Sequence, residues 1–177
     1  MIVESRVLAL PRANVDTDQV FPGKYLSLIS REGFGEKLFE GMPGGRELLA
    51  SKPGARIIVV GDNFGCGSSR EHAVWALVDY GFKAIVAPSL ARIFHENAYN
   101  NGLVPVIVRD PQAHAACLAA ERLSIDVANE TIRAEGCEIA RFELDPLKKE
   151  FLLRGGFMEY LASKVDTVRA WTRRRVS

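Results

Sequence analysis

Residues 56–72 read RIIVVGDNFGCGSSREH. This stretch opens with a continuous β-branched run, which predicts a strand buried on both faces. Gly61–Gly67 is rich in glycine and predicts a tight loop, and helical sequence follows from about Glu71 to Tyr80, where Gly81 ends the helix. These three segments determine the class of the fold, because strands buried on both faces belong mainly to parallel sheets.

The same alternation continues toward the carboxyl terminus. Phe82–Ala87 predicts a second buried strand, and Pro88-Ser89 opens a second helix whose apolar residues recur at helical spacing as far as Ala98. Leu103–Val108 predicts a third strand. The order strand–helix–strand–helix–strand implies parallel pairing. We therefore expect an α/β fold with a central parallel sheet.

The flanking segments differ from this pattern. The opening of the chain, with its polar cluster at Asn14–Asp18, is predicted to be loop-like. Residues 30–54, rich in glycine, proline and charge, are predicted to form a mobile loop. After the third strand we expect a helix, three short strands and a pair of carboxyl-terminal helices, over residues 113–122, 123–128, 131–134, 139–144 and about 146–174. We expect a single domain over residues 1–177.

Composition excludes several classes of protein. The chain has 177 residues, 47% hydrophobic and 25% charged, which is typical of globular domains. Its net charge of +1 argues against a nucleic-acid or membrane-surface role. No apolar run reaches the ~20 residues of a membrane span, and the start lacks the apolar core of a signal peptide. Three scattered cysteines, Cys66, Cys117 and Cys137, indicate a reduced, cytoplasmic protein without a disulfide framework.

The loop before the first predicted helix is the best candidate for a site. It leaves the carboxyl end of a buried strand and enters a helix amino terminus, which is where ligands bind in open α/β sheets. Backbone N–H groups and the helix dipole favour an anion there. Ser68 and Ser69 add two hydroxyls, and Arg70 adds a guanidinium that can bind a carboxylate through two hydrogen bonds.

Structural interpretations of the same residues remain open. Ser68 and Glu71 fit the Ser-x-x-Glu pattern of a capping box, and one serine could cap the helix while the other reacts. For Glu71 and His72 we favour supporting roles, in helix capping or in hydrogen bonds to the residues of the site. Arg70 could instead form a surface salt bridge.

Thr17 and Asp18 belong to a polar cluster, and the alternative interpretation of that cluster is an Asx-type turn.

Familiar nucleotide-binding and metal-binding motifs do not fit the candidate segments of this sequence. Arg70 stands where a dinucleotide fingerprint needs its third glycine, and the loop has no P-loop lysine. His95-Glu96 is not followed by a second histidine, and Val20 stands where a calcium loop needs an oxygen ligand.

These segments resemble one family over nearly the whole chain. The family comprises the small subunits of 3-isopropylmalate dehydratase, which correspond to the carboxyl-terminal swivelling domain of aconitase. The most specific match is the Gly-Ser-Ser-Arg-Glu-His run at 67–72. The other matching segments are Asn14–Gln19, Gly61–Leu77, Ala87–Ser89, Asn101–Leu103, Phe142–Pro146 and Leu152-Leu153.

The resemblance implies a fold and a reaction. The fold would be a three-layer β/β/α swivelling domain, and the reaction would interconvert 2-isopropylmalate and 3-isopropylmalate by dehydration and rehydration in leucine biosynthesis. By resemblance, Ser68 would be the catalytic base. Ser69 and Arg70 would hold substrate carboxylate oxygens. Asp18, with Thr17 beside it, matches an active-site pair of aconitase, and both would also belong to the substrate-binding residues.

The resemblance also implies a partner and a cofactor. Removing hydroxide from carbon needs a Lewis acid, and the scattered cysteines and histidines of this chain do not predict a metal site. In the family, a [4Fe–4S] cluster on a separate large subunit supplies it. The chain would therefore contain no cofactor of its own and would act only with the cluster-bearing large subunit.

The chain departs from the family at two places. Many bacterial small subunits carry a longer insertion where this chain has only residues 30–54, and many have proline at the position of Val74. The family chooses its substrate side chain with the loop that here includes Lys24, Tyr25 and Leu26. Homoaconitase, dimethylmalate dehydratase and methylmalate dehydratase activities therefore remain alternatives, as do a non-catalytic carboxylate-binding module and a structural partner domain.

Overall fold

The computed structural model describes residues 1–27 and 33–176, and within the last helix it describes the side chains of residues 157–165 and of Arg169. Seven strands form one mixed sheet with the order β4-β3-β2-β1-β5-β6-β7. This confirms the predicted α/β fold. The sheet divides at β1 into a parallel half and an antiparallel half, and the two halves have different connections.

The parallel half contains the three strands expected from the sequence. They are β2 (Ile57–Val60), β3 (Ala84–Ala87) and β4 (Val104–Ile107), and the helices α3 (Glu71–Tyr80) and α4 (Arg92–Asn100) connect them. All pairs from β1 to β4 are parallel. The carboxyl ends of these strands therefore meet at one edge of the sheet, where the loops before α3 and α4 lie.

The antiparallel half consists of β5 (Arg122–Asp126), β6 (Thr131–Ala134) and β7 (Cys137–Arg141). The preceding helix α5 (Pro111–Ala119) begins two residues before the predicted start, because Asp110 caps it and proline occupies its first position. The strand β5 starts at Arg122, which the sequence prediction had placed in that helix. Short turns join the three strands.

The first strand corrects the prediction of a loop-like start. Residues Ile2–Leu10 form β1, and this strand belongs to both halves of the sheet. Ile2–Arg6 pairs antiparallel with β5, whereas Val7–Leu10 pairs parallel with β2. The alternating burial of residues 2–6 is the pattern of a strand with one covered face. The charged Glu4 and Arg6 lie on the exposed face of that strand.

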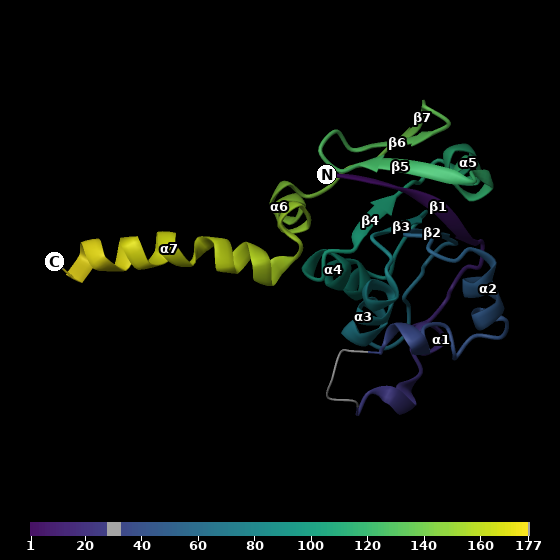
Figure 1. Cartoon of the computed structure of the whole chain (residues 1–177), viewed down its shortest axis with the longest axis horizontal. Helices are drawn as coiled ribbons and strands as arrows, with labels where there is room; N and C mark the ends of the chain where they lie inside the picture. Colours follow the sequence, from purple (N-terminus) through teal and green to yellow (C-terminus); the bar gives the residue numbers. More distant parts are fainter. Residues whose placement is uncertain (28–32, 177) are drawn as a thin grey trace.

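Two hydrophobic cores lie on opposite faces of the parallel strands. Along β2, Ile58 and Val60 join the core beneath α3 and α4, while Ile57 and Val59 join the core beneath the antiparallel strands. Figure 1 shows these layers, with β5, β6 and β7 on one side of the parallel strands and α1, α2 and α3 on the other. This is the β/β/α arrangement that the resemblance implied.

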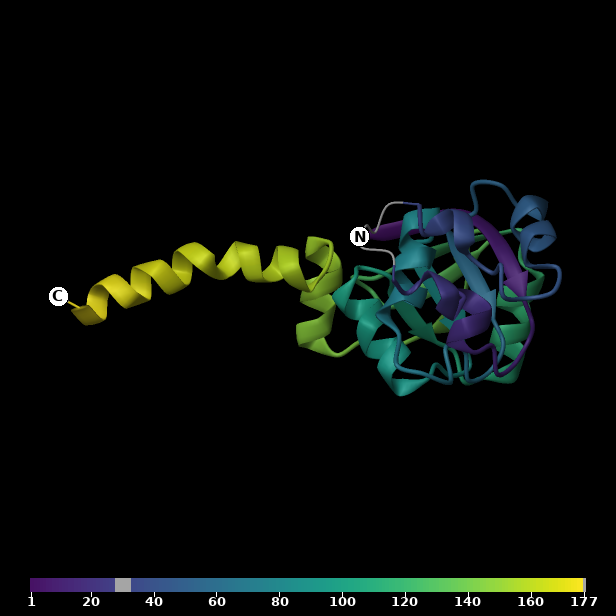
Figure 2. The same ribbon diagram turned by 90° about the horizontal axis from the view of Figure 1, so that it is seen from below.

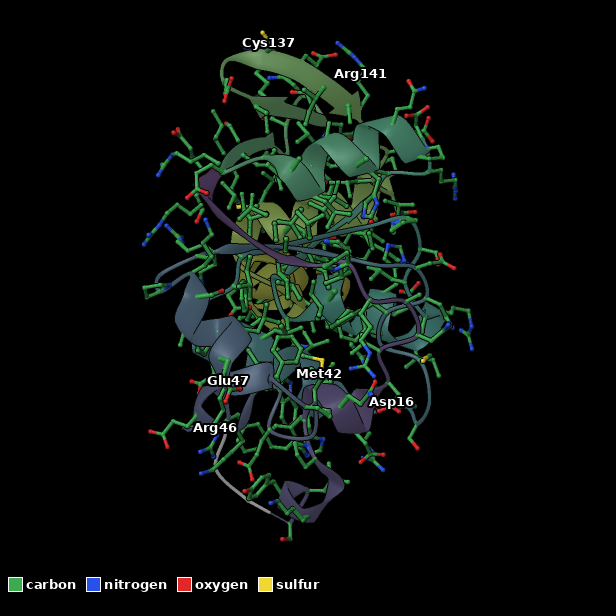
Figure 3. The ribbon with its side chains drawn as sticks, turned by 90° about the vertical axis from the view of Figure 1, so that its right-hand side faces the viewer. Asp16, Met42, Arg46, Glu47, Cys137 and Arg141 are labelled. Atoms are coloured by element: carbon green, nitrogen blue, oxygen red, sulfur yellow. The ribbon has the colours of Figure 1, made fainter. Side chains whose placement is uncertain are left out.

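The helical layer also contains the amino-terminal segments. These are α1 (Thr17–Val20), the 3-10 turns η1 (Gly23–Tyr25) and η2 (Gly35–Lys37), and α2 (Gly45–Ser51). Figure 3 labels Asp16, Met42, Arg46 and Glu47 in the lower half of the molecule, and Cys137 and Arg141 of β7 at its top. The site described below therefore lies far from the antiparallel edge strand.

The segment predicted as a mobile loop contributes buried residues. Residues 30–32 lie outside the described residues, but Phe34, Phe39, Met42 and Leu49 are all buried in the core beneath the helical layer. The segment is therefore not a simple surface connection, although its mobility stays a prediction. Its glycines permit close packing, because a Cβ at Gly45 would lie 2.2 Å from the carbonyl oxygen of Phe39.

Two helices end the chain. Asp145 caps α6 (Pro146–Arg154), accepting hydrogen bonds from the backbone N–H groups of residues 147 and 148. The second, α7 (Phe157–Val176), extends away from the rest of the molecule, as Figures 1 and 2 both show. No helix in the described part of the chain is long and apolar enough to cross a membrane.

Candidate active site

Two loops from adjacent parallel strands lie side by side at the carboxyl edge of the sheet. One follows β1 and leads to α1, and the other follows β2 and leads to α3. The N–H of Thr17 donates to the carbonyl oxygen of Cys66 at 2.9 Å. The N–H of Gly65 donates to the carbonyl oxygen of Val15 at 2.8 Å. This pairing fixes residues 15–17 beside residues 65–68.

The α1 segment is held by its own cap. Asp16 and Gln19 form a reciprocal capping box, a pattern visible in the sequence that our sequence analysis missed. This cap places the side chain of Thr17 in the interior, where it is 2% exposed. Its hydroxyl donates to the backbone carbonyl of Ser68 at 3.0 Å. Thr17 therefore positions the backbone of Ser68.

The capping box proposed for Ser68 and Glu71 does not form. Arg70 is the N-cap residue of α3, and no side chain caps this helix. The carboxylate of Glu71 instead accepts a hydrogen bond from the side-chain amide of Asn101 at 2.7 Å. Ser68 and Ser69 are exposed, and neither hydroxyl has a hydrogen-bond partner among the described residues. Both hydroxyls are therefore available to a ligand.

Arg70 and Asp18 form an ion pair between the two loops. The side chain of Arg70 is 20% exposed and that of Asp18 is 55% exposed. Asp18 also accepts a hydrogen bond from the N–H of Gly23 at 3.0 Å. The salt-bridge alternative for Arg70 is thus realised, but within the cluster that the resemblance identified. The ion pair orients the guanidinium and neutralises much of its charge.

A cavity of about 190 Å³ opens beside these residues. Its first wall consists of Thr17, Gly65, Gly67 and Ser68–Arg70. Its second wall is Ala91–Phe94, where α4 begins, and the sequence analysis did not identify that segment as part of a site. The signal was available, because the loops after neighbouring parallel strands meet at the same edge of a sheet.

Aromatic packing supports the start of α3. The ring of His72 lies 4.7 Å from that of Trp75 and 5.9 Å from that of Phe34, measured between ring centroids. The indole N–H of Trp75 donates to the side-chain oxygen of Asn101 at 3.0 Å, and Asn101 also holds Glu71. Glu71 and His72 are not part of the cavity lining. Their supporting roles stay predictions, and this packing is consistent with them.

Lys24 contacts a carboxylate of its own chain. Its ammonium lies 2.8 Å from Glu40, and the hydroxyl of Tyr25 donates to the same carboxylate at 2.7 Å. The hydrogen bonds from Lys24 and Tyr25 lower the pKa of Glu40 to about 2, and the hydrogen bond to Glu40 is the main cause that raises the pKa of Lys24. This cluster joins the segment after α1 to the turn at residue 40.

No group of three histidine, cysteine, aspartate or glutamate side chains gathers within the described residues. The cysteines lie in three different environments, with Cys66 half-buried, Cys117 buried and Cys137 exposed. The described part of the chain therefore shows no candidate site for a metal ion. The expectation that a partner carries the cluster stays a prediction.

Known proteins resemble this chain along most of its length. The family described as "Aconitase C-terminal domain" matches residues 3–111. The 3-isopropylmalate dehydratase small subunit of Anaeromyxobacter dehalogenans strain 2CP-C is 43% identical over 166 residues, covering 87% of this chain and 86% of the relative. That of Anaeromyxobacter sp. strain K is also 43% identical, over 181 residues, and covers 93% of both chains.

A solved structure supports the same relationship. The 3-isopropylmalate dehydratase structure from Methanocaldococcus jannaschii superposes with a TM-score of 0.81 at 31% sequence identity. The alignment covers 97% of this chain and 99% of the other. The likeness therefore includes both halves of the sheet and is not limited to the parallel core.

Proposed function

Because the chain belongs to the aconitase C-terminal domain family, and within it to the 3-isopropylmalate dehydratase small subunits, we propose that it interconverts 2-isopropylmalate and 3-isopropylmalate together with a large subunit. As a member of this family, the chain is a small subunit of an aconitase-family hydro-lyase. The substrate, the roles of individual residues and the partner's cofactor are the proposal.

One observation carries the proposal. Ser68 lies in a cavity wall with Ser69 and Arg70, and its hydroxyl does not serve as a helix cap. A serine that caps a helix has its oxygen committed to a backbone N–H. Here the oxygen accepts no hydrogen bond from another described residue, while the Thr17 hydroxyl holds the backbone of the same residue.

These residues suit the removal of a proton from carbon. Ser68 would accept the proton from the carbon adjacent to a carboxylate while hydroxide leaves the neighbouring carbon, which produces an alkene. Rehydration with the opposite orientation would return that proton and place the hydroxyl on the other carbon. A serine oxygen is a weak base unless its negative charge is stabilised, and the guanidinium of Arg70 and the adjacent helix amino terminus can stabilise it.

Ser69 and Arg70 would hold oxygens of one substrate carboxylate, and Asp18 would keep Arg70 in place. Arginine suits this task because its planar guanidinium matches a carboxylate through two hydrogen bonds. Thr17 would act indirectly, through the carbonyl oxygen of Ser68. Glu71 and His72 would support the start of α3 through Asn101 and the aromatic cluster.

The large subunit would carry the [4Fe–4S] cluster. When bound there, the cluster would supply the Lewis acid that accepts the departing hydroxide. This chain would contribute the proton acceptor and the carboxylate-binding groups, and so it would be inactive alone. We place the reaction in the cytoplasm, where reduced cysteines and an oxygen-sensitive partner are compatible.

Substrate choice within the malate homologues is a separate part of the proposal. Tyr25 and Leu26 pack partly buried against the helical core, on the segment that follows Asp18. Their fixed position is consistent with a pocket wall for an alkyl group. Homocitrate or homoaconitate and the methylated malates are the substrates to compare with isopropylmalate.

The experiment is anaerobic reconstitution with the large subunit from the same organism. With 3-isopropylmalate as substrate, turnover followed by the ultraviolet absorbance of the alkene should require both chains. Ser68→Ala should lower kcat by roughly 10³-fold, the range expected for removal of a general base. Ser124→Ala, on β5 in the antiparallel half, is the matched control and should leave kcat unchanged.

The control measurements decide between explanations. Circular dichroism and size-exclusion chromatography should show that Ser68→Ala folds and pairs with the large subunit as the wild type does. Full activity of a variant lacking both serines would make the chain a structural partner instead. Turnover of another malate homologue, with none of 3-isopropylmalate, would retain the hydro-lyase assignment and change the substrate.

A further inference from the structure

The second wall of the cavity contains a cation that has no ion-pair partner among the described residues. Arg92, the first residue of α4, lines the same cavity as Ser68 and Arg70. We infer that Arg92 is a substrate-binding residue, which holds the second carboxylate of the dicarboxylate whose first carboxylate contacts Arg70. The inference rests on the proposed function and names a residue that the sequence analysis did not select.

The two arginines of the cavity differ in how their charge is used. Arg70 is 20% exposed and paired with Asp18, which also binds the N–H of Gly23. Arg92 is exposed and has neither an ion pair nor a side-chain hydrogen bond to any other described residue. An arginine guanidinium is always charged at physiological pH. The charge of Arg92 is therefore available to a ligand, whereas that of Arg70 is largely balanced.

Without Arg92, the cavity offers too little positive charge to balance the two negative charges of a dicarboxylate. Among the residues that line the cavity, Arg70 and Arg92 are the charged ones. After the Arg70–Asp18 pair is counted, one positive charge remains, and it belongs to Arg92. A malate homologue carries two negative charges at neutral pH, because carboxyl groups ionise near pH 4. The second carboxylate is best placed against the free guanidinium.

The neighbours of Arg92 favour a strong interaction. Ile93 follows it on the cavity wall and presents an apolar side chain that is 39% exposed. Phe94 packs beneath, edge-on to Phe64, with ring centroids 5.3 Å apart. An apolar wall beside a charged group limits its solvation once a ligand covers it, and electrostatic attraction is stronger where water is excluded.

The test uses the reconstituted two-chain enzyme and three variants. Arg92→Gln should raise KM for 3-isopropylmalate by roughly 10- to 100-fold, the effect of losing a charged hydrogen bond. The value of kcat should change by less than about 3-fold if the lost interaction contributes equally to substrate and transition-state binding. Arg92→Lys should recover part of the loss. Arg133→Gln, an equal change of charge on β6, should leave KM unchanged.

A pair of inhibitors isolates the second carboxylate. Isopropylsuccinate has both carboxylates of the substrate and no hydroxyl, and 4-methylpentanoate lacks one of those carboxylates. In the wild-type enzyme the dicarboxylate should inhibit more strongly. In Arg92→Gln its inhibition constant should rise by the same roughly 10- to 100-fold, while that of the monocarboxylate should change little.

Each outcome has one meaning. A wild-type KM in Arg92→Gln, or an equal loss for both inhibitors, overturns the role of Arg92 and leaves the proposed function intact. A higher requirement for large subunit, with normal KM at saturation, assigns Arg92 to the subunit interface and also overturns it. Failure of the wild-type enzyme to turn over any malate homologue is instead a failure of the proposed function.

Discussion

The parallel and antiparallel halves of the sheet both cover a buried core, yet the candidate active site belongs to the parallel half alone. The connections from β1 to α1, from β2 to α3 and from β3 to α4 all leave the same edge and meet around one cavity. In the antiparallel half, short turns join β5, β6 and β7 at alternate ends, so their loops are separated. A site forms where connections gather, whereas strand burial alone does not create one.

The largest expected difference between the halves concerns two glycines with left-handed backbones. Gly65 has a φ of +77°, and a Cβ there would lie 2.3 Å from the ring of Phe94. Gly136, in the β6–β7 turn, has a φ of +81° and no heavy atom within 4 Å of that position. Gly65→Ala should destabilise the fold by about 3 kcal/mol, and Gly136→Ala by about 1 kcal/mol.

Urea unfolding at equilibrium measures both changes. The Gly65→Ala variant should also lose activity at temperatures where it is still folded, because the shift of Phe94 displaces the second wall of the cavity. The Gly136→Ala variant should retain full activity. Equal unfolding free energies for the two variants would contradict the tight contact between the β2–α3 loop and α4.

A smaller difference is expected for two buried threonines. The hydroxyl of Thr17 donates to the carbonyl of Ser68, whereas the hydroxyl of Thr131, on β6, has no hydrogen bond to another described residue. Thr17→Val keeps the shape of the side chain and removes this bond, which should cost about 1 kcal/mol of stability. We expect kcat of Thr17→Val to fall by about 10-fold, because Ser68 is then less firmly positioned.

Thr131→Val provides the comparison in the antiparallel half. Valine is well suited to a strand, so this change should alter the unfolding free energy by less than about 0.5 kcal/mol and leave kcat unchanged. Steady-state kinetics of both reconstituted variants, alongside urea unfolding, make the comparison. A normal kcat in Thr17→Val would show that its hydrogen bond does not matter for turnover.

The smallest expected difference is a dependence on pH. The pKa of Glu40 is lowered to about 2 from an ordinary value of 4.5, chiefly by the hydrogen bond from Lys24 and then by that from Tyr25. A lowered carboxyl pKa contributes stability above pH 4.5, and this contribution is lost as the pH falls toward 2. Glu40→Gln should therefore lower the melting temperature at pH 6 and have progressively less effect between pH 4.5 and 2.

Asp126 is the counterpart in the antiparallel half. Its pKa is also lowered, first by the side-chain hydrogen bond from Asn129 and then by the backbone N–H of Asn129. Asp126 and Asn129 lie in the same turn. The partners of Glu40 are more distant in the sequence, because Lys24 lies 16 residues and Tyr25 lies 15 residues before it. Asp126→Asn should therefore change the melting temperature less at pH 6 than Glu40→Gln. Scanning calorimetry across this pH range tests the order, and a larger effect of Asp126→Asn would reverse it.

The parallel half was predicted well from the sequence, because a continuous β-branched run is typical of a strand that is buried on both faces. It missed β1, although Val3, Ser5 and Val7 alternate with charged residues as a strand with one covered face requires. Composition also misled the prediction around Phe39 and Met42. Glycine and proline suggested a surface loop there, but the glycines permit close packing of backbone against backbone.

For the site, the sequence supplied residues but not their partners. Ser68 and Arg70 were selected from the loop and from the resemblance, and the structure adds that Thr17 and Asp18 hold them. Whether Ser68 was a cap or a free hydroxyl depended on where α3 begins, which sequence alone places only within a few residues. Arg92 was missed because its relation to Ser68 depends on the neighbouring order of β2 and β3.

The shared strand β1 has a consequence for the time course of synthesis. Val7–Leu10 can pair with β2 once residue 60 has been made, but Glu4 pairs with Ser124, 120 residues later in the chain. At about 5–20 residues per second, the ribosome needs on the order of ten seconds to make the sequence between them. Residues 2–6 thus wait for the strand with which they pair until β5 has been made. Slower translation of the sequence between β1 and β5 would lengthen this exposure without altering any contact of the finished protein.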